Sequence, residues 1–379
     1  MIDDNDAASK RRQTLEDYVG GRDNNFNLIR FLAAFAVLLS HSYALSTGDS
    51  SREPLRGWLG MSAGDVAVDV FFMTSGFLVT GSLIARQSVL SFATARALRI
   101  YPGLLLSIVV TIIAVGLWFS SQSLASFFLD RETWRYLAKN GTLVTGIAYN
   151  LPGVFEFTPF RLAVNGSLWS LPYELGMYAL LAMAWLAVAI VRLPLSKYFA
   201  GAVALILVLA LGAEVGLLHV SRIEPLTWHL VAMFFAGSCL YLFRIRVPVD
   251  RRLFALLLLA LIGASISTNK RAFAITYLFT MPYVVLYLSY VPGGLLRRFN
   301  RLGDYSYGTY IYAFPVQQML AASVPGIGPL QMLGASFAIT TILAVLSWHW
   351  IEKNALALKT RAGAATAPSP PRVGRNVRM

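Results

Sequence analysis

A histidine and an arginine share one apolar segment near the start of the chain. Arg30 and His41 lie eleven positions apart, and every residue between them is apolar or small. On an α-helix that spacing is about three turns, so the two side chains share a face about 16 Å apart along the axis. Ionisable groups are costly in an apolar helix and indicate a functional site. The alternative is an arginine that reaches for the membrane surface and an isolated polar histidine.

Carboxylates occur in two further apolar segments. Asp65 and Asp69 lie four residues apart, so they share a helix face. Asp65 suits a cap at the outer helix end, whereas Asp69 lies deeper. In a later segment Glu174 follows Ser170 by four residues, and we expect it at the outer end beside Trp169. A carboxylate buried in a membrane needs a partner.

Two arginines precede the third apolar segment. Arg96 and Arg99 are three residues apart and project side by side from a helix. Two guanidinium groups can bind phosphate oxygens through paired hydrogen bonds. Basic residues at the inner surface of a membrane look the same without any ligand, so both interpretations stay open. Tyr310 belongs to a run of four tyrosines that begins another segment, and these line either a polar cavity or a membrane interface.

The composition is that of a membrane protein. Hydrophobic residues make up 56% of the 379, charged residues 13%, and the mean hydropathy is +0.60, whereas about a quarter of a soluble domain is charged. The net charge of +13 follows the predicted membrane loops, so we do not expect nucleic acid as a partner. The single cysteine and the wide spacing of the four histidines argue against a metal site. His219 and His229 flank a short outer loop and are predicted to be solvated.

The hydropathy pattern predicts an all-α, polytopic membrane protein with about ten transmembrane helices. The spans are placed near 27–45, 65–85, 100–120, 167–191, 198–219, 226–243, 253–268, 272–290, 304–323 and 330–351. The long connection 121–166 is expected to fold as a lid or a re-entrant element. With both termini in the cytoplasm, 23 of the 32 Lys and Arg residues fall in inner segments, as the positive-inside rule expects.

The chain divides into three parts. Residues 1–25 are polar and mixed in charge, which is not typical of a cleavable signal peptide, and are interpreted as a cytoplasmic N-terminal segment. Residues 26–355 form the transmembrane domain. Residues 356–379 are rich in Ala and Pro with several arginines, and we expect a disordered basic tail.

Five motifs in order resemble those of the acyltransferase 3 family of bacterial integral-membrane acyltransferases. They are Arg30-x10-His41, Asp69-Val-Phe-Phe-x-x-Ser75-Gly76-Phe77, Arg96-x-x-Arg99-Ile-x-Pro102, Leu168-Trp-Ser170-Leu-x-x-Glu174 and Ser306-Tyr-Gly-x-Tyr310. The motifs lie in order within residues 26 to 352, from Arg30 to Tyr310, so the resemblance covers nearly the whole chain. It implies an acyl-CoA donor taken from the cytoplasm, with acetyl-CoA as the default. It also implies a glycan or lipid-linked saccharide acceptor outside the cytoplasm, such as O-antigen or exopolysaccharide, and a place in the bacterial inner membrane.

On this basis we predict an O-acyltransferase with three groups of site residues and no metal. The predicted catalytic residues are His41, Arg30, Glu174 and Asp69, the predicted donor-binding residues are Arg96 and Arg99, and the predicted substrate-binding residues are Trp169, Ser170 and Tyr310. His41 would act as general base on the acceptor hydroxyl or, less simply, carry the acyl group. Glu174 and Asp69 would orient His41 or the acceptor. The oligomeric state is not predicted.

Two features depart from the family pattern. Many relatives carry a histidine before the proline of the ninth span, where this chain has Ala313-Phe314-Pro315. The soluble esterase-like domain of some members is also not expected, as in stand-alone glycan acetyltransferases. A proton-coupled transporter remains the alternative function, because such carriers also hold ionisable residues within their spans. The two halves of the sequence show no convincing repeat, which disfavours that class.

Overall fold

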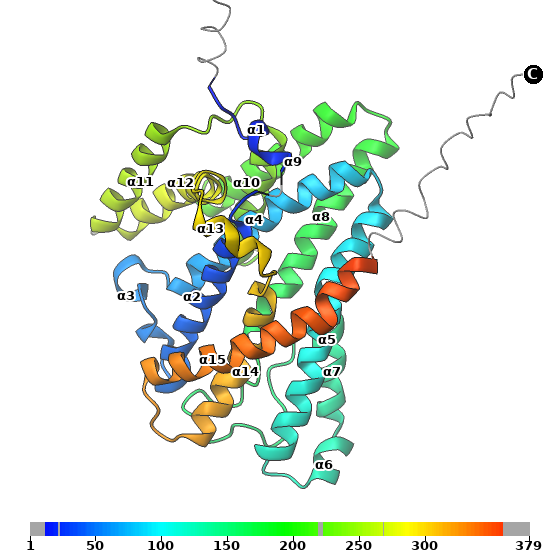
Figure 1. The fold of residues 1–379 in the computed structure, drawn as a ribbon, viewed down its shortest axis with the longest axis vertical. Helices are drawn as coiled ribbons and strands as arrows, with labels where there is room; N and C mark the ends of the chain where they lie inside the picture. Colours follow the sequence, from blue (N-terminus) through cyan, green and yellow to red (C-terminus); the bar gives the residue numbers. More distant parts are fainter. Residues whose placement is uncertain (1–11, 22, 219–222, 268, 359–379) are drawn as a thin grey trace, which may run out of the picture.

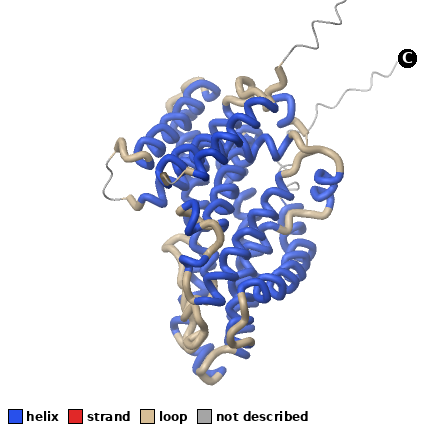
Figure 2. The backbone as a smooth tube through the Cα atoms, turned by 90° about the vertical axis from the view of Figure 1, so that its left-hand side faces the viewer, coloured by secondary structure: helices blue, strands red, loops and turns tan. Residues whose placement is uncertain are grey.

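The computed structural model describes residues 12–21, 23–218, 223–267 and 269–358, and every regular element in these ranges is helical (Figure 1, Figure 2). In the same ranges, β-structure is limited to two isolated bridges, between Thr14 and Pro248 and between Ser120 and Val154. The prediction of an all-α polytopic membrane protein is confirmed.

Eight helical segments of the described chain are long and apolar enough to cross a bilayer. They are α2 (Phe26–Thr47), α4 (Ala63–Arg86), α5 (Val89–Trp118), η3 (Gly166–Trp169) with α8 (Ser170–Ile190), α9 (Leu195–Glu214), α10 (Pro225–Leu242), α12 (Lys270–Tyr290), and α15 (Pro329–Ser347) with η5 (Trp348–Glu352) and the turns up to Leu358. Each corresponds to a span predicted from the sequence.

The other two predicted spans are also helices, α11 (Arg251–Ile266) and α14 (Ser306–Ser323). α11 has 16 residues and is largely exposed, so it is short for a span. α14 has 18 residues and is almost wholly buried, with its tyrosines and glutamines inside the bundle. It is less apolar because it faces protein rather than lipid. The count of ten and the orientation stay predictions.

Short helices precede the first long helix or lie between the long ones. They are α1 (Glu16–Val19), η2 (Ser50–Arg52), α3 (Arg56–Leu59), α6 (Leu124–Leu129), α7 (Arg131–Thr142), α13 (Leu295–Arg298) and η4 (Phe299–Arg301).

α5 begins eleven residues before the predicted start of its span at residue 100. Ser88 caps its N-terminus, because the Ser88 Oγ accepts a hydrogen bond from the Ser91 N–H over 3.3 Å. Arg96 and Arg99 therefore lie within the helix. The helix thus extends beyond the apolar stretch predicted as the span, because polar residues at the start of a long helix lower its hydropathy without ending it, and their place at the inner surface stays a prediction.

The connection after α5 is folded, as predicted. α6 and α7 run back along α5 at the lower end of the molecule (Figure 1), and residues 143–165 then return the chain to the interior. The buried Asn165 ends this return, where its side-chain amide donates to the Ile311 carbonyl over 2.9 Å. α8 therefore begins inside the bundle and not at its surface.

α4 and α10 pack most closely of all the helices. A Cβ added to Gly76 would collide with the Phe234 carbonyl oxygen, and one added to Gly237 would collide with the Met73 carbonyl oxygen. Small residues allow such close backbone approach between membrane helices. This seam fixes the two helices relative to each other.

The helix at the C-terminal end continues to Leu358, so residues 356–358 are helical and the predicted start of the disordered tail is three residues too early. The rest of that tail, residues 1–11 of the N-terminal segment, and His219 lie outside the described residues.

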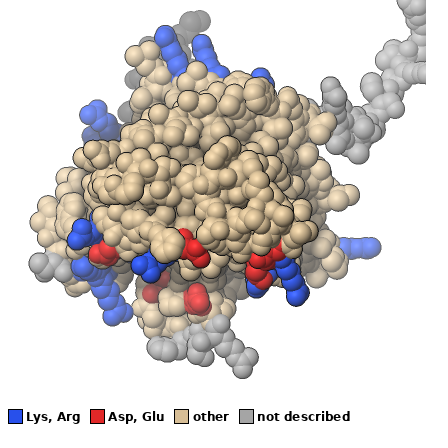
Figure 3. Space-filling model, turned by 90° about the horizontal axis from the view of Figure 1, so that it is seen from below, with Lys and Arg blue, Asp and Glu red and all other residues tan. Residues whose placement is uncertain are grey.

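The exposed surface is rich in large apolar side chains, including Ile190, Leu259 and Ile266. Seen from below, a broad area is free of charged side chains (Figure 3), which suits contact with lipid.

Candidate active site

Arg30 and His41 lie on one uninterrupted helix, α2. The Arg30 Nη1 donates to Ser75 Oγ over 3.2 Å and to Thr74 Oγ1 over 3.4 Å, both on α4. Its guanidinium carbon lies 5.1 Å from the centre of the Phe71 ring, within range of a cation–π contact. The half-buried arginine is therefore held inside the bundle by α4, which argues against an arginine that merely reaches for the membrane surface.

Glu174 lies beside Arg30 near the start of α8, and this start lies inside the bundle and not at the predicted outer surface. Ser75 Oγ donates to Glu174 Oε1 over 3.3 Å, and the Tyr178 hydroxyl donates to the same oxygen. Ser75 therefore bridges the arginine and the carboxylate. The predicted position was wrong because α8 begins in the interior, where residues 143–165 deliver the chain.

Arg30 and Glu174 line a small cavity of about 30 Å³, which is enough room for a water molecule. Ser170 and Tyr310 line the same cavity, and their hydroxyl oxygens are 2.7 Å apart. The Tyr310 hydroxyl donates to the Ser167 carbonyl over 2.7 Å. Two predicted catalytic residues and two predicted substrate-binding residues thus meet in one place.

Trp169 does not join this group, although it precedes Ser170 directly. Its ring packs edge-on against Tyr173 with the ring centres 5.9 Å apart, and it is not among the residues that line the cavity.

His41 lies outside the cavity, nearer the other end of α2. Its ring meets the Phe314 ring edge-on, with the centres 5.2 Å apart. Its Nδ1 is buried and has no hydrogen-bond partner among the described residues. Buried polar atoms are rarely left unpaired without a functional reason, so this nitrogen is available to a substrate group.

α14 supplies a polar neighbour next to this histidine. Gln317 Nε2 donates to the Leu38 carbonyl and to Ser42 Oγ on α2, each over 2.8 Å. The Gln317 Oε1 is buried and, within the described part of the chain, also lacks a partner. The seam between α2 and α14 therefore holds two buried polar atoms, His41 Nδ1 and Gln317 Oε1, whose hydrogen bonds are unmade.

The connection between α5 and α8 covers this end of the seam. The Phe160 ring lies 6.2 Å from the Phe314 ring, centre to centre. Gln318 Nε2 donates to the Phe160 carbonyl over 2.7 Å and to the Ala163 carbonyl over 2.6 Å. Residues 155–163 are thus tied to α14 directly above the aromatic neighbour of His41.

Asp69 belongs to a separate polar cluster. Asp69 Oδ1 lies 2.9 Å from His229 Nε2, and Asp69 Oδ2 accepts from the Tyr277 hydroxyl over 2.9 Å. The His229 Nδ1 lies 3.1 Å from Glu214 Oε1. With 21% of its side chain exposed, His229 is mostly buried, so the prediction that it is solvated is wrong. The cluster joins α4, α9, α10 and α12.

Neither predicted catalytic carboxylate contacts His41, because Asp69 and Glu174 are both engaged elsewhere in the bundle. The prediction that one of them orients His41 is therefore not supported by this geometry. Asp65, in contrast, acts as the cap that its position predicts: its Oδ2 accepts from the Ser62 N–H over 2.7 Å.

Arg96 and Arg99 both lie on α5, but their side chains contact different partners on other segments. Arg99 pairs with Asp304, and its Nη1 lies 3.7 Å from Glu352 Oε2. The guanidinium carbon of Arg96 lies 5.9 Å from the centre of the Tyr178 ring, and its buried Nε has no hydrogen-bond partner in the described ranges. The charge of Arg99 is therefore balanced by two carboxylates, whereas the Arg96 side chain keeps an unpaired donor.

No group of three or more His, Cys, Asp or Glu side chains in the described part of the chain is arranged to hold a metal ion.

Comparison with known proteins adds the family. Residues 23–349 match the family model described as "Acyltransferase domain". The chain belongs to this acyltransferase 3 family. The match spans most of the chain and agrees with the resemblance carried by the five motifs. The protein is therefore an acyltransferase enzyme of the multi-pass membrane type, which disfavours the transporter alternative.

Two curated relatives are similar over most of their length. The "O-acetyl transferase" of Shigella phage Sf6 is 30% identical over 354 residues, which cover 88% of this chain and 96% of the relative. The "Nodulation protein 10" of Rhizobium leguminosarum bv. viciae is 29% identical over 386 residues, which cover 91% of this chain and 96% of the relative. No solved structure matches the chain.

Several residues of these networks were missed by sequence reasoning. His229 and Glu214 are distant in sequence from Asp69 and carry no local motif. The signal that was present is the buried Asp69 itself, since a carboxylate at that depth requires a partner, and His229 lies within the apolar stretch of α10. Tyr178 follows Glu174 by four residues and so shares its helix face, a spacing that predicts the contact.

Proposed function

We propose that this enzyme moves an acetyl group from cytoplasmic acetyl-CoA to a hydroxyl group of a glycan outside the bacterial inner membrane. The family supports acyl transfer, and the relative named an O-acetyl transferase supports acetyl as the group and a hydroxyl as its acceptor. The observation that carries the proposal is the buried, unpaired Nδ1 of His41 on a membrane-spanning helix.

His41 is the proposed general base. Its neutral imidazole accepts the proton of the acceptor hydroxyl while the hydroxyl oxygen forms a bond to the thioester carbonyl carbon. The carbon–sulfur bond then breaks, and the thiolate of CoA leaves and takes the proton from the imidazolium. The reaction needs no net proton and no further reactant. Gln317 Oε1, the other unpaired atom of the seam, is suited to hold a second hydroxyl of the acceptor.

Arg30 and Glu174 are proposed to act on the donor side. Their link through Ser75 keeps the arginine from standing as an isolated charge in the bundle. Ser170 and Tyr310 line the same cavity, and a thioester arm that opened this cavity would meet their hydroxyl groups. Because Asp69 lies in the cluster with His229, we propose a positioning role for it through α4.

Arg96 and Arg99 remain proposed donor-binding residues, with unequal parts. The unpaired Nε of Arg96 suits a diphosphate oxygen. Arg99 is already paired with Asp304 and Glu352, so it is suited to position α5 against α14 and the end of α15. Trp169 is proposed to shape the acceptor side through its contact with Tyr173.

The acceptor is proposed to approach from the side of the α5–α8 connection. A cavity of about 540 Å³ opens there beside Trp118, Phe157 and Glu156. Aromatic rings can stack on sugar rings, and a carboxylate can accept hydrogen bonds from sugar hydroxyl groups. This mixture of apolar and polar lining is expected of a ligand pocket. Residues 155–163 connect this cavity to the Phe314–His41 contact.

The test is transfer of label in membranes. Membranes that contain the protein, supplied with acetyl-CoA labelled in the acetyl group, are expected to yield labelled, alkali-labile acetyl esters in the glycan fraction, while membranes without it do not. Equal labelling of both membranes, or uptake of a solute in place of transfer, would contradict the proposal.

A further inference from the structure

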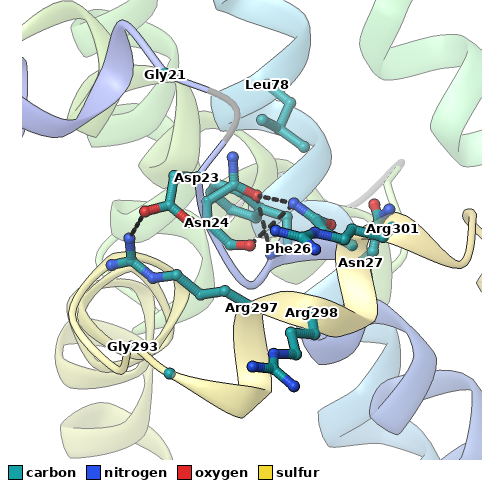
Figure 4. A pocket seen from close by; sticks show the side chains of 12 residues that line it. Gly21, Asp23, Asn24, Phe26, Asn27, Leu78, Gly293, Arg297, Arg298 and Arg301 are labelled. Atoms are coloured by element: carbon teal, nitrogen blue, oxygen red, sulfur yellow. Dashed lines mark hydrogen bonds and ion pairs between the residues drawn. The ribbon is translucent and has the colours of Figure 1, made fainter.

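One large cavity does not belong to the site above. It has a volume of about 810 Å³ and lies where α2 begins, against α13 and η4 (Figure 4). Leu78 of α4 forms part of its wall, and three arginines, Arg297, Arg298 and Arg301, line it. The volume is that of a pocket for a ligand of nucleotide size.

The frame of this cavity is fixed by hydrogen bonds. Arg297 pairs with Asp23, and its Nε donates to the Pro292 carbonyl over 3.1 Å. The side-chain amide of Asn300 donates to the Asn24 carbonyl over 2.9 Å. These contacts tie the segment before α2 to the segment after α12, so the cavity is a built feature and not a gap between loose loops.

Two of the three arginines that line the cavity take no part in these hydrogen bonds. Arg298 and Arg301 are exposed, and within the described part of the chain neither has an ion-pair or hydrogen-bond partner. Figure 4 shows no contact from Arg298 to the other residues drawn. Because Arg297 is balanced by Asp23, the described lining residues carry two net positive charges. Unpaired guanidinium groups at the rim of a cavity are suited to phosphate.

We propose that this cavity binds the 3′-phosphate and adenosine of the acyl-CoA donor, with Arg298 and Arg301 on the phosphate. The inference rests on the proposed function, because it assumes that the donor is a CoA thioester. It assigns the nucleotide to a site separate from Arg96 and Arg99, which would be left with the diphosphate.

The position of the cavity fits the reach of the donor. Asn27 lines it and lies one turn before Arg30 on α2. From Asn27 to His41 the helix rises about 21 Å. The pantetheine arm has about as many backbone bonds as four or five amino-acid residues, so its extended length is roughly 15 Å. Arg96 lies against Tyr178, which donates to Glu174 beside Arg30. A nucleotide in the cavity and a diphosphate on Arg96 would therefore bring the thioester toward His41.

Lipid is the other source of phosphate at this place. Leu295 and Leu296 are exposed beside the arginines, and basic residues near a membrane surface attract anionic headgroups. The cavity favours the nucleotide, because a headgroup needs no pocket of this volume and no amide side chains such as those of Asn24 and Asn27.

The test uses the full-length protein in lipid nanodiscs and measures the dissociation constants of CoA and of 3′-dephospho-CoA. The variant combines Arg298→Gln with Arg301→Gln, and Arg251→Gln, an exposed arginine at the start of α11, is the matched control. We expect the wild type and the control to bind CoA at least about tenfold more tightly than 3′-dephospho-CoA. In the double variant CoA binding should weaken by about that factor, and the preference should vanish.

Each outcome decides something different. If the double variant binds CoA as the wild type does, the nucleotide does not sit here and the inference is wrong, while the proposed function stands. If its only defect is the loss of stabilisation by phosphatidylglycerol, measured against discs of phosphatidylcholine alone, the site serves lipid and the inference is overturned. If the wild type binds neither CoA form, the proposed function fails together with the inference.

Discussion

His41 and His229 are two histidines in apolar helices with opposite surroundings. Both ring nitrogens of His229 lie within hydrogen-bond distance of carboxylates, at 2.9 Å from Asp69 and 3.1 Å from Glu214. The Nδ1 of His41 is buried without a partner among the described residues, and its neighbour is the Phe314 ring. The imidazole of His229 is hydrogen-bonded by the protein on both sides, whereas that of His41 is not.

This difference separates a residue that holds helices together from a residue that can do chemistry. His229 joins helices that are far apart in the sequence, and both of its ring nitrogens are already occupied by carboxylates. His41 has an uncommitted nitrogen at a seam that also carries the unpaired Gln317 Oε1. Position within a span does not distinguish the two histidines, because both lie in helices that can cross a bilayer.

Replacement of His41 should have the largest effect on turnover. His41→Ala should lower kcat for acetyl transfer by about 10²- to 10⁴-fold, the usual contribution of a general base, and leave the Tm in detergent within a few degrees of wild type. Steady-state transfer by the purified protein, with a thermal melt of the same sample, gives both values. A fully active His41→Ala enzyme would remove the base from the mechanism.

Replacement of His229 should act on stability instead. His229→Ala leaves the buried Asp69 without its imidazole partner, at a cost of about 3 kcal/mol in the free energy of unfolding, while the folded fraction keeps its activity. Thermal unfolding and activity per folded molecule measure the two effects. The comparison with His41 breaks down if His229→Ala folds normally but is inactive.

Glu174→Gln should have a smaller effect. The amide keeps the shape of the side chain but loses the charge beside Arg30, and we expect about a tenfold fall in kcat/KM, equivalent to about 1.4 kcal/mol. Glu132→Gln, at an exposed site on α7, is the control. Wild-type kinetics in Glu174→Gln would assign the carboxylate to packing alone.

Tyr310→Phe should have the smallest effect of the set. It deletes the hydroxyl that lies between Ser170 and the Ser167 carbonyl, which should cost about 1 kcal/mol of stability. If Tyr310 also contacts substrate, KM will rise in addition. An unchanged Tm would show that water replaces the hydroxyl without loss.

The sequence predicted what local spacing controls. Arg30 and His41 lie on one helix because their eleven-residue separation is an apolar helical stretch, and Asp65 caps α4 because it follows Ser62 by three residues. The family was likewise visible, since its motifs are short and lie within single helices.

The sequence did not predict what depends on the depth of a helix or on distant partners. Glu174 was expected at the surface because a helix start usually lies there, but residues 143–165 carry the start of α8 into the interior. The contact of Asp69 with His229 joins residues 160 positions apart, and no local pattern encodes it. Arg99 was expected to face a ligand, and its pairing with Asp304 spans 205 positions.

Inverted membrane vesicles give the most direct test of the role of His41. Their cytoplasmic face is outside, so labelled acetyl-CoA added to the medium meets only the proposed donor side. Vesicles with the wild type or with His229→Ala are expected to label the enclosed glycan, in proportion to folded protein, and those with His41→Ala are not. Equal labelling by His41→Ala would contradict the account.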